Sequence, residues 1–453
     1  MSIFIGKPID LIFRFLTYVQ PTHYFALASE DGAYVFPKVM DLPEDIKSQL
    51  EEDFLYSTKV SREYDMSWQA VQKGYMGEGK TYKNVEKLPL QDEYRFIRKY
   101  FNPLWATYIL VLRLSGIKSP LNEIKAWRKS KNTQRSTYLD KPIAYPTWEN
   151  YDSSLQKEQP LISVVIPTLN RYTYLKDVLE DFEKQTYTNF ELIVVDQSEP
   201  FRKEFYDSFR LNIHLIHQEE KALWLARNSA IRAAKGTFIA LSEDDVRVSP
   251  NWLEQHLKCI DFFKADISAG VFFPEGASIP KERSFFARAQ QFATGNALIY
   301  RTVYNEIGLF DRQFEKQRMG DGEFGLRCHI AGFKSVSNPF ASCIDVKAPF
   351  GGLRQLGSWD AFRPKKWFSP RPIPSVIYLF RNYYGHHRTR LSLLKSVPSS
   401  IMPYRFKRNK KMLLLGALIS IFMFPLVLIQ VCRSWYLAGK MIRQGNKIEM
   451  LEL

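Results

Sequence analysis

Between residues 161 and 245 the chain alternates apolar runs with helical patterns, and this alternation constrains the fold more than any other feature. The runs have the length and composition of buried parallel strands. They are LISVVIPTLN (161–170), FELIVVDQS (190–198) and TFIALSEDD (237–245). Between them, residues 174–185 place apolar side chains at helical spacing, and residues 222–236 predict a second helix that ends at Gly236. Strands alternating with helices predict an α/β fold: an open, mostly parallel sheet with helices on both faces.

Polar side chains gather where these strands end. Ligands bind beside the carboxyl ends of strands in open sheets, so these residues form the candidate site. They are Thr168, Asn170, Asp196, Glu243, Asp244 and Asp245. Three adjacent carboxylates repel one another in a cleft unless a cation neutralises them. Mg²⁺ and Mn²⁺ take oxygen ligands and usually bridge to phosphates, so the pattern indicates a metal-bound diphosphate; the alternative is an exposed acidic turn.

A second stretch, GYMGEGKT (74–81), matches the phosphate-binding loop G-x-x-x-x-G-K-[ST] at every fixed position. That loop requires a buried strand before it and a helix N-terminus after it. The preceding DMSWQAVQK lacks a run of Val, Ile and Leu, and the following YKNVEKLPL soon reaches Pro89. A glycine-rich surface loop is therefore the favoured interpretation, and a nucleotide triphosphatase acting through Gly74 to Thr81 is the disfavoured one.

The formal net charge of +15 is concentrated near the C-terminus. Residues 361–448 hold 17 Lys and Arg and no Asp or Glu, whereas the rest of the chain holds 46 basic and 48 acidic residues. Inside this tract, residues 412–432 are 21 uncharged residues, long enough to cross a bilayer. The combination favours an anionic membrane surface, rather than nucleic acid, as the partner. Gly416 and Pro425 leave spanning, re-entrant and in-plane arrangements open, and a buried core helix is the alternative.

Two further features bear on the compartment of the protein. The four cysteines are scattered without a C-x-x-C pair, which argues against a disulfide framework and against a zinc site. The N-terminal MSIFIGKPIDLIFRF is interrupted by Lys7, Pro8, Asp10 and Arg14, so it has no continuous signal-peptide core. We therefore expect the body of the protein to lie in the cytosol.

The pattern along the chain predicts three parts. Residues 1–155 form an accessory domain of unknown role, whose many aromatic side chains either stack on sugars or, as we favour, fill a core. Pro142, Pro146 and the polar run at 149–160 predict a linker. Residues 156–360 form the α/β domain with the candidate site, and residues 361–453 form a basic, membrane-associated region that contains the apolar run.

Four motifs together resemble the family 2 glycosyltransferases with the GT-A fold, a nucleotide-diphospho-sugar transferase fold. They occur in the family's order: ISVVIPTLNR, ELIVVDQS, ARNSAIRAAKG and FIALSEDDVRVSPNWLE. Two later segments support the resemblance. TGNALIYRTVYNEIGLFDRQF (294–314) is similar to the family's "G-x-N-x-x-x-R … G-x-F-D" segment, and RMGDGEFGLRCHIAGF (318–333) is similar to its "E-D-x-[DE]-[LF]" segment followed by Arg. The resemblance implies that residues 156–360 are a GT-A catalytic domain.

The resemblance also implies roles for four residues in donor binding. Thr168 and Asp196 match positions that hold the nucleoside of a nucleotide-sugar donor, with Asn170 beside them. Arg227 matches an arginine that contacts the donor diphosphate.

The remaining implied roles belong to acidic residues. Glu243, Asp244 and Asp245 match the family's D-x-D region, in which Asp244 faces the ribose and Asp245 binds the metal. Asp321 falls where the family places its catalytic base. The family's Glu-Asp pair is here Gly320 followed by Asp321, so the acidic neighbour of the base is absent.

An enzyme of this kind transfers a sugar from a nucleotide-diphosphate sugar to a hydroxyl of a glycan or lipid-linked acceptor, with Mn²⁺ or Mg²⁺ as cofactor. One base opposite the leaving group gives inversion. QVCRSW (430–435) is one residue too long for the processive Q-x-x-R-W motif, so we expect a nonprocessive hexosyltransferase. We expect it to act in cell-surface polysaccharide synthesis at the cytoplasmic face of the cell membrane. A nucleotide-sugar-binding or pyrophosphorylase-like protein of the same fold is the alternative.

Overall fold

The computed structural model describes residues 6–451, apart from 117, 290, 291, 293, 353–359, 365, 407 and 408. The chain divides into two compact units. The sheet unit comprises Tyr145–Leu379 and Met423–Leu453, and the helical unit comprises Phe4–Ala144 and Phe380–Phe422. Each unit therefore combines segments that are far apart in the sequence.

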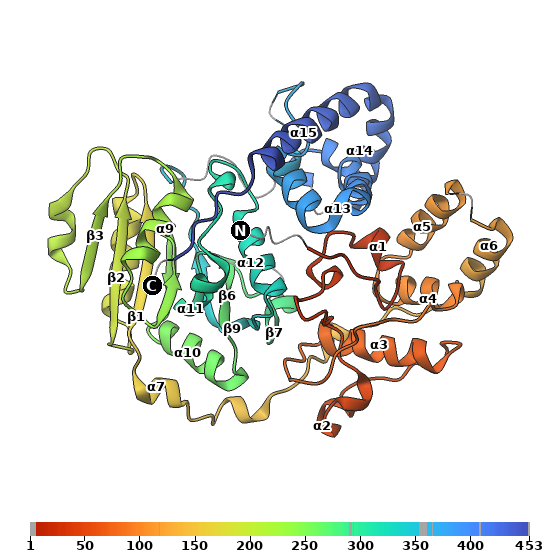
Figure 1. Cartoon of the computed structure of the whole chain (residues 1–453), viewed down its shortest axis with the longest axis horizontal. Helices are drawn as coiled ribbons and strands as arrows, with labels where there is room; N and C mark the ends of the chain where they lie inside the picture. The colour runs from red at the N-terminus through yellow and green to blue at the C-terminus, as the bar shows by residue number, and fades with distance from the viewer. Residues whose placement is uncertain are drawn as a thin grey trace. The chain divides into compact units, whose positions relative to one another are not determined.

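Four parallel strands form one half of the sheet, in the order β3-β2-β1-β4, of which β3, β2 and β1 are labelled side by side in Figure 1. Their bounds are Ile162–Thr168 (β1), Phe190–Asp196 (β2), Ile213–His217 (β3) and Phe238–Leu241 (β4). β1, β2 and β4 confirm the three predicted strands, and β1 is buried along its whole length, as its continuous apolar run indicates. β3 was not predicted, because its residues are only partly buried and form no apolar run.

The other half of the sheet is mixed. β8 runs antiparallel to both β4 and β6, β6 and β9 are parallel, and β5 and β7 pair antiparallel with β9. The bounds are Val246–Val248 (β5), Ile267–Pro274 (β6), Ala287–Arg288 (β7), Ala297–Tyr300 (β8) and Ser335–Asp345 (β9). The sheet is thus mixed and mostly parallel, with antiparallel strands that the sequence pattern did not reveal.

Helices cover both faces of the sheet. α8 (Tyr172–Glu183) connects β1 to β2, and α9 (Leu223–Ala233) connects β3 to β4. The chain moves outward from β1 to β3 and then returns past β1 to β4, so right-handed crossovers place α8 and α9 on opposite faces. The winding therefore reverses between β1 and β4, which is where open sheets bind their ligands.

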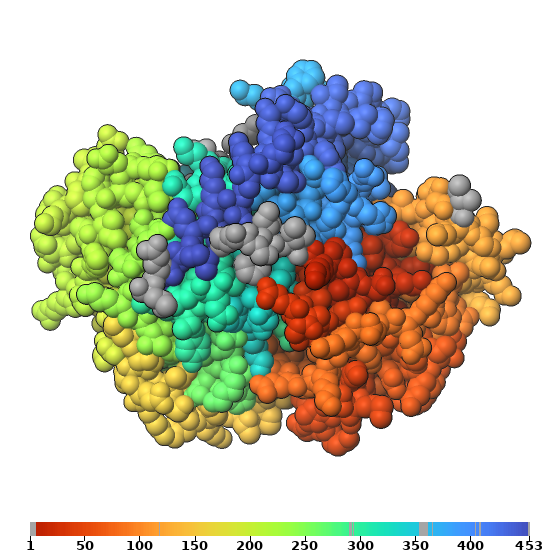
Figure 2. All heavy atoms as spheres, in the orientation of Figure 1, coloured from red at the N-terminus to blue at the C-terminus, as the bar shows by residue number. Residues whose placement is uncertain are grey.

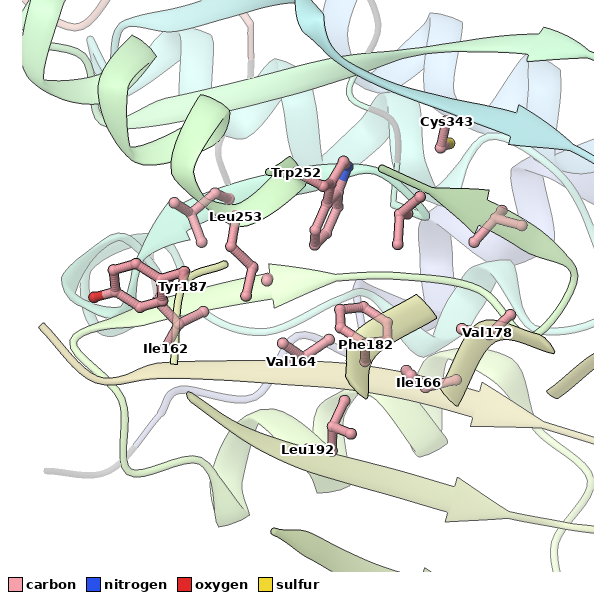
Figure 3. Close-up of a cluster of buried hydrophobic side chains, with 14 of the residues drawn as sticks. Ile162, Val164, Ile166, Val178, Phe182, Tyr187, Leu192, Trp252, Leu253 and Cys343 are labelled. Carbon is pink, nitrogen blue, oxygen red and sulfur yellow. The ribbon is translucent and has the colours of Figure 1, made fainter. Parts of the chain in front are cut away.

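α8 and α10 (Trp252–Phe263) bury one face of the sheet. Val164 and Ile166 of β1 belong to one buried cluster with Phe182 of α8 and Trp252 of α10 (Figure 3). Alternate residues of β1 reach this cluster because successive side chains of a strand point to opposite faces. Burying each such side chain stabilises the fold by roughly 1.5–3 kcal/mol, and this packing fixes the end of β1.

Asn296, from the TGN segment, ties this core to the second half of the sheet. Its Oδ1 accepts hydrogen bonds from Trp252 Nε1 and His256 Nε2, both at 3.0 Å. Its Nδ2 donates to the Ala341 carbonyl at 3.0 Å. All of these groups are buried, so the asparagine of the TGN segment is a structural residue.

The other helices of the sheet unit are short, apart from α15. They are α7 (Ser154–Glu158), α11 (Arg301–Ile307), α12 (Gly320–Ile330) and α15 (Phe424–Gln444), with 3₁₀ turns at Pro146–Trp148, Lys203–Ser208, Lys281–Arg283, Arg312–Phe314 and Asp360–Phe362. α13 (Pro374–Ser396) is kinked at Gly385 and contributes residues to both units.

The helical unit contains a core of aromatic side chains. Phe13 and Phe96 stack with ring centroids 3.9 Å apart, and Trp68 packs edge-on against Phe96. These rings are buried, which favours core filling over sugar stacking. The helices are α1 (Leu16–Val19), α2 (Glu44–Lys47), α3 (Lys59–Gln72), α4 (Leu90–Tyr100), α5 (Leu104–Ser115), α6 (Pro120–Lys129) and α14 (Lys410–Phe422), with 3₁₀ turns at Tyr24–Ala26, Val39–Asp41, Tyr138–Asp140, Pro398–Ile401 and Tyr404–Phe406.

The Gly74 to Thr81 stretch lies in the helical unit and lacks the context of a phosphate-binding loop. It follows α3 rather than a strand, and the next helix, α4, begins only at Leu90. The Gly79 amide donates to the Tyr75 hydroxyl at 3.2 Å, and Thr81 forms a β-bridge with Pro37. These contacts favour the surface-loop interpretation.

The apolar run at 412–432 is divided between α14 and α15, which are separated at Met423. Pro425 lies in the first turn of α15, where its missing N–H leaves no helical hydrogen bond unmade. Within the described residues, no single helix is long and apolar enough to cross a membrane, and α14 and α15 meet that criterion only together, as a bent pair.

Candidate functional site

The candidate site lies between the carboxyl ends of β1 and β4. Thr168, the last residue of β1, is paired in register with Asp196 at the end of β2. Its hydroxyl donates to Asp244 Oδ2 at 2.8 Å, and Asp244 follows β4. The fold thus brings together Thr168, Asp244 and Asp245, as the sequence predicted from the strand ends.

Arg171 is the residue of this site that sequence reasoning missed. Its Nη1 lies 2.9 Å from Asp244 Oδ1 and 2.9 Å from Asp245 Oδ2, so one guanidinium bridges both carboxylates. Its Nε donates to the Phe350 carbonyl at 3.1 Å. Arg171 belongs to the PTLNR motif, but only the tertiary structure shows that its side chain turns back onto the acidic pair.

The acidic pair is largely removed from water. Burial raises the pKa of Asp244 to about 6, and the neighbouring Asp245 charge adds to this effect. Arg171 and the Thr168 hydroxyl act in the opposite direction, because both stabilise the carboxylate. The site therefore holds concentrated negative charge that a cation must balance, and within the described residues Arg171 supplies that cation.

Arg227, on α9, has the opposite character. It is fully buried, and its Nε and Nη1 have no hydrogen-bond partner among the described residues. Its Nη2 lies 3.4 Å from Glu243 Oε1, and the Trp224 ring lies under the guanidinium at 5.7 Å. Burial lowers the pKa of Arg227 to about 10, while the nearby charges of Asp321 and Asp244 raise it. The side chain remains a cation, and the N–H groups on Nε and Nη1 meet no acceptor among the described residues.

Glu243 is positioned by the absence of a side chain at Gly295. A Cβ on Gly295 would lie 2.5 Å from the carboxyl carbon of Glu243, so a side chain at this position would force the Glu243 carboxylate to move. The TGN segment therefore shapes the site through Gly295. Glu243 faces Arg227, whereas Asp244 and Asp245 face Arg171, so the three adjacent acids divide between two arginines.

Asp196 is fully buried in a separate polar cluster at the end of β2. Its Oδ2 accepts hydrogen bonds from the hydroxyls of Tyr172 at 2.7 Å and Tyr206 at 2.8 Å, and its Oδ1 accepts from the Ser198 amide at 2.8 Å. Burial, followed by the hydrogen bond to Asp196, raises the pKa of Tyr172 to about 12. The two tyrosines were not predicted, because a tyrosine near a strand end carries no distinctive pattern.

Asn170 shapes the loop after β1. It adopts a left-handed conformation with φ of 55°, which asparagine tolerates better than most residues. Its backbone amide donates to Ser198 Oγ at 2.7 Å, and its side-chain Oδ1 accepts from the Glu199 backbone amide at 2.9 Å. These bonds join the loops that follow β1 and β2, so the predicted residue Asn170 holds the loop that contains Ser198 and Glu199.

Asp321 lies in the first turn of α12, is exposed, and is close enough to Arg227 to raise the pKa of that arginine. Trp224 explains why its acidic neighbour is missing. A Cβ on Gly320 would lie 2.4 Å from Trp224 Cζ2, so the indole occupies the space that a side chain at this position would need. Asp321 is thus an exposed carboxylate close to the buried Arg227.

The acidic pair fits a divalent cation only in part. Within the described residues, no group of three His, Cys, Asp or Glu side chains could hold a metal ion. Asp245 Oδ2 also accepts a hydrogen bond from the Ala348 amide at 3.1 Å. Mg²⁺ is nonetheless usually held by one or two carboxylates together with substrate phosphates, which is what Asp244 and Asp245 can offer. A cation at these oxygens requires Arg171 to move away.

Comparison with known proteins identifies the family. The model of "Glycosyl transferase family 2" matches residues 163–326. The uncharacterized glycosyltransferase YwdF of Bacillus subtilis (strain 168) is 30% identical over 184 residues, covering 37% of this chain and 67% of YwdF. The putative teichuronic acid biosynthesis glycosyltransferase TuaG of the same organism is 29% identical over 105 residues, covering 22% of this chain and 42% of TuaG.

With its GT-A-like α/β fold, the chain belongs to glycosyl transferase family 2, a family of glycosyltransferases (EC 2.4). In three other relatives, which are 29–34% identical, the matched stretch covers only 22–50% of the protein. The mannosyltransferase PcManGT from Pyrobaculum calidifontis, solved in complex with GDP-Man and Mn²⁺, has a TM-score of 0.40 and 15% identity, over 66% of this chain and 92% of that one. These values are too low to carry its ligands over to this chain.

Proposed function

We propose that this protein transfers a sugar from a nucleotide-diphosphate sugar to a hydroxyl of a glycan or lipid-linked acceptor. The main support for this proposal is the environment of Arg227. Two nitrogens of this fully buried guanidinium have no hydrogen-bond partner among the described residues, which is costly unless an anion completes the hydrogen bonds. A diphosphate has the charge and the acceptor oxygens to do so, and the site lies at the switch point where open sheets bind nucleotides.

The other predicted residues divide the donor between them. We assign the nucleoside to Thr168, Asn170 and Asp196, at the ends of β1 and β2, and the ribose to Asp244. Asp245 would hold a divalent cation, Mn²⁺ or Mg²⁺, together with the donor phosphates. When bound, this cation would neutralise the charge that develops on the leaving diphosphate.

Asp321 is proposed as the general base. Its exposed carboxylate can accept the proton of the acceptor hydroxyl while that oxygen bonds to the anomeric carbon of the donor. The bond from this carbon to the diphosphate breaks at the same time, and the nucleoside diphosphate leaves with the electron pair. Attack opposite the leaving group inverts the anomeric centre. Glu243 faces Arg227 and holds its guanidinium in place.

The setting is proposed from composition and relatives. TuaG is named for teichuronic acid biosynthesis, which supports a role in surface polysaccharide synthesis. The tract at 361–448, with 17 basic and no acidic residues, supports a position at the cytoplasmic face of the cell membrane. The absence of a correctly spaced Q-x-x-R-W motif supports addition of one or few sugars.

A labelled-donor assay tests this function. The purified full chain is incubated with UDP, GDP and TDP sugars and Mn²⁺, with and without a lipid-linked acceptor, and the products are separated. We expect a nucleoside diphosphate and a glycosylated acceptor from one donor. Release of nucleoside triphosphate when pyrophosphate is added would instead show a pyrophosphorylase, and binding without any product would show a binding protein.

A further inference from the structure

α14, in the helical unit, packs on one side against the described part of its own chain and leaves its other side exposed. Gly416 is buried so tightly that a Cβ there would lie 2.7 Å from Met402 Cγ. The opposite side carries large exposed apolar side chains at the spacing of one helix face. They are Leu414, Leu415, Leu418, Ile421 and Phe422. An exposed patch of this kind is typical of an interaction surface.

α15, in the sheet unit, is divided in the same way. Its buried residues follow one another at intervals of three or four positions: Val427, Gln430, Ser434, Ala438 and Met441. The exposed face begins with apolar side chains and continues with aromatic and basic ones. In order these are Phe424, Leu428, Ile429, Arg433, Tyr436 and Lys440. Figure 2 shows the C-terminal helices, in blue, at the surface of the molecule.

Two more aromatic rings enlarge the apolar surface beside α15. Gln430 Nε2 donates to the carbonyl of Trp367, and Arg433 Nη1 donates to the carbonyl of Phe368 at 2.8 Å. These bonds hold the loop against α15, yet both aromatic side chains remain exposed. The backbone of this loop is therefore hydrogen-bonded to α15, while the Trp367 and Phe368 side chains are exposed to solvent.

The charges around these faces indicate the partner. Lys410 and Lys411 begin α14, and Arg433 and Lys440 lie on the exposed face of α15. From 361 to 448 the sequence has no acidic residue. Lysine and arginine reach headgroups through apolar stems, while leucine, isoleucine and phenylalanine enter the acyl boundary. A bilayer that contains anionic lipids offers both environments.

We propose that α14 and α15 dock in the plane of such a bilayer, each through its exposed face. Each helix already uses its other face against its own unit, as at Gly416 and at Gln430, whose Oε1 accepts from Arg371 Nε at 2.9 Å. Only one side of each helix is left for lipid, which fits an in-plane position. This docking requires no donor, and so it stands apart from the proposed transfer reaction.

Vesicle flotation of the full chain tests the proposal. The vesicles contain phosphatidylcholine alone or phosphatidylcholine mixed with phosphatidylglycerol. The variants are Leu418→Asp on α14 and Leu428→Asp on α15, with Leu55→Asp as the control because Leu55 is equally apolar and 77% exposed elsewhere. We expect wild type and the control to float with the mixed vesicles, and each docking-face variant to bind about tenfold more weakly, as expected for losing one buried leucine.

A second readout uses Cys432, which is exposed on α15 while the other three cysteines are buried. A polarity-sensitive fluorophore on Cys432 should shift to the blue with the mixed vesicles and not in buffer. Equal flotation of wild type and both docking-face variants would overturn the proposal. So would self-association without lipid that these variants abolish, because a second copy would then cover the faces.

Donor binding by calorimetry separates this proposal from the proposed function. Leu418→Asp and Leu428→Asp should bind the donor as wild type does. Loss of vesicle binding with intact donor binding therefore supports docking alone, and vesicle binding without any donor binding would contradict only the transferase mechanism.

Discussion

Burying a guanidinium without hydrogen-bond acceptors costs free energy. Arg171 and Arg227 differ in how many of these acceptors the protein itself supplies. Arg171 is balanced within the protein by Asp244 and Asp245. Arg227 contacts the Glu243 carboxylate at 3.4 Å, and its Nε and Nη1 have no hydrogen-bond partner among the described residues. Arg171 covers Asp244 and Asp245 and partly neutralises their charge. An anionic ligand would gain most binding free energy at Arg227, whose hydrogen bonds are incomplete within the described residues.

Asp321 gives the first prediction at this scale. Asp321→Asn removes the proton acceptor but leaves Arg227, Asp244 and Asp245 in place. We expect turnover to fall by about 10² or more, the usual effect of losing a general base, while donor affinity stays the same. Single-turnover kinetics and calorimetry measure the two quantities separately. Undiminished turnover would place the base on another residue.

Gly320 gives a second prediction, with Gly322 as its matched control. Gly320→Ala places a Cβ against the buried Trp224 and should destabilise the fold by about 1–3 kcal/mol, as overpacking does. A Cβ on Gly322, on the same helix, meets nothing within 4 Å, so Gly322→Ala should be neutral or stabilising. Denaturant unfolding compares the two variants. Equal destabilisation would show that the indole does not fill the space beside Gly320.

At the scale of elements, α10 is joined to the sheet by a neutral histidine. His256 Nε2 donates to Asn296 Oδ1, so Nδ1 is the nitrogen that accepts from the Ser268 hydroxyl at 2.8 Å. Burial lowers the pKa of His256 to about 3, because a charged imidazole there would lose its hydration. The unfolded chain binds the proton near pH 6.5 and the folded chain does not.

His256 therefore makes stability depend on pH. The depressed pKa means that its contribution is full above about pH 6.5 and is lost as the pH falls toward 3. At pH 5 this one residue should lower the free energy of unfolding by about 2 kcal/mol relative to neutral pH. In His256→Gln, denaturant unfolding from pH 7.5 to 5 should show a correspondingly weaker pH dependence. An unchanged slope would show that His256 titrates normally in the fold.

The elements that were predictable are those whose burial appears in the local pattern. β1, β2 and β4 are buried throughout or nearly so, and their apolar runs revealed them. β3 alternates exposed and partly buried residues, and β5 and β7 are only two or three residues long, so they have no such signal. β8 runs antiparallel to its neighbours β4 and β6. Which strands pair, and in which direction, depends on residues far apart in the sequence, so a local pattern does not predict it.

At the scale of the whole molecule, the polar residues at the strand ends predicted where the site lies. The structure shows which of these side chains contact one another. Thr168, Asp244 and Asp245 meet because β1 and β4 are neighbours in the sheet, a strand order that the structure shows and the alternation of strands and helices did not specify. The bridge from Arg171 and the burial of Arg227 depend on tertiary packing. No pattern within a few residues encodes such contacts, so the sequence could indicate the place but not the charge balance.

The glycine-rich loop from Gly74 to Thr81, in the helical unit, allows the alternative nucleotide site to be tested. Its match to a phosphate-binding loop predicts that Lys80 would be essential if that loop bound the nucleotide. The loop follows a helix and its Gly79 amide is bonded to Tyr75, so we expect Lys80→Ala to leave donor binding and transfer unchanged. A large loss of nucleotide affinity, measured by calorimetry, would restore the triphosphatase interpretation.

The most direct test of the account is calorimetry of nucleoside diphosphate binding to Arg227→Met, in the presence of Mn²⁺. UDP and GDP serve as probes because they carry the diphosphate without the sugar. The control is Arg232→Met, on the same helix, whose side chain is 40% exposed and pairs with Glu449 away from the site. We predict that Arg227→Met loses at least about tenfold in affinity, as expected for removing a charge-assisted hydrogen bond, and that Arg232→Met matches wild type. Unchanged binding by Arg227→Met would contradict the proposed donor site.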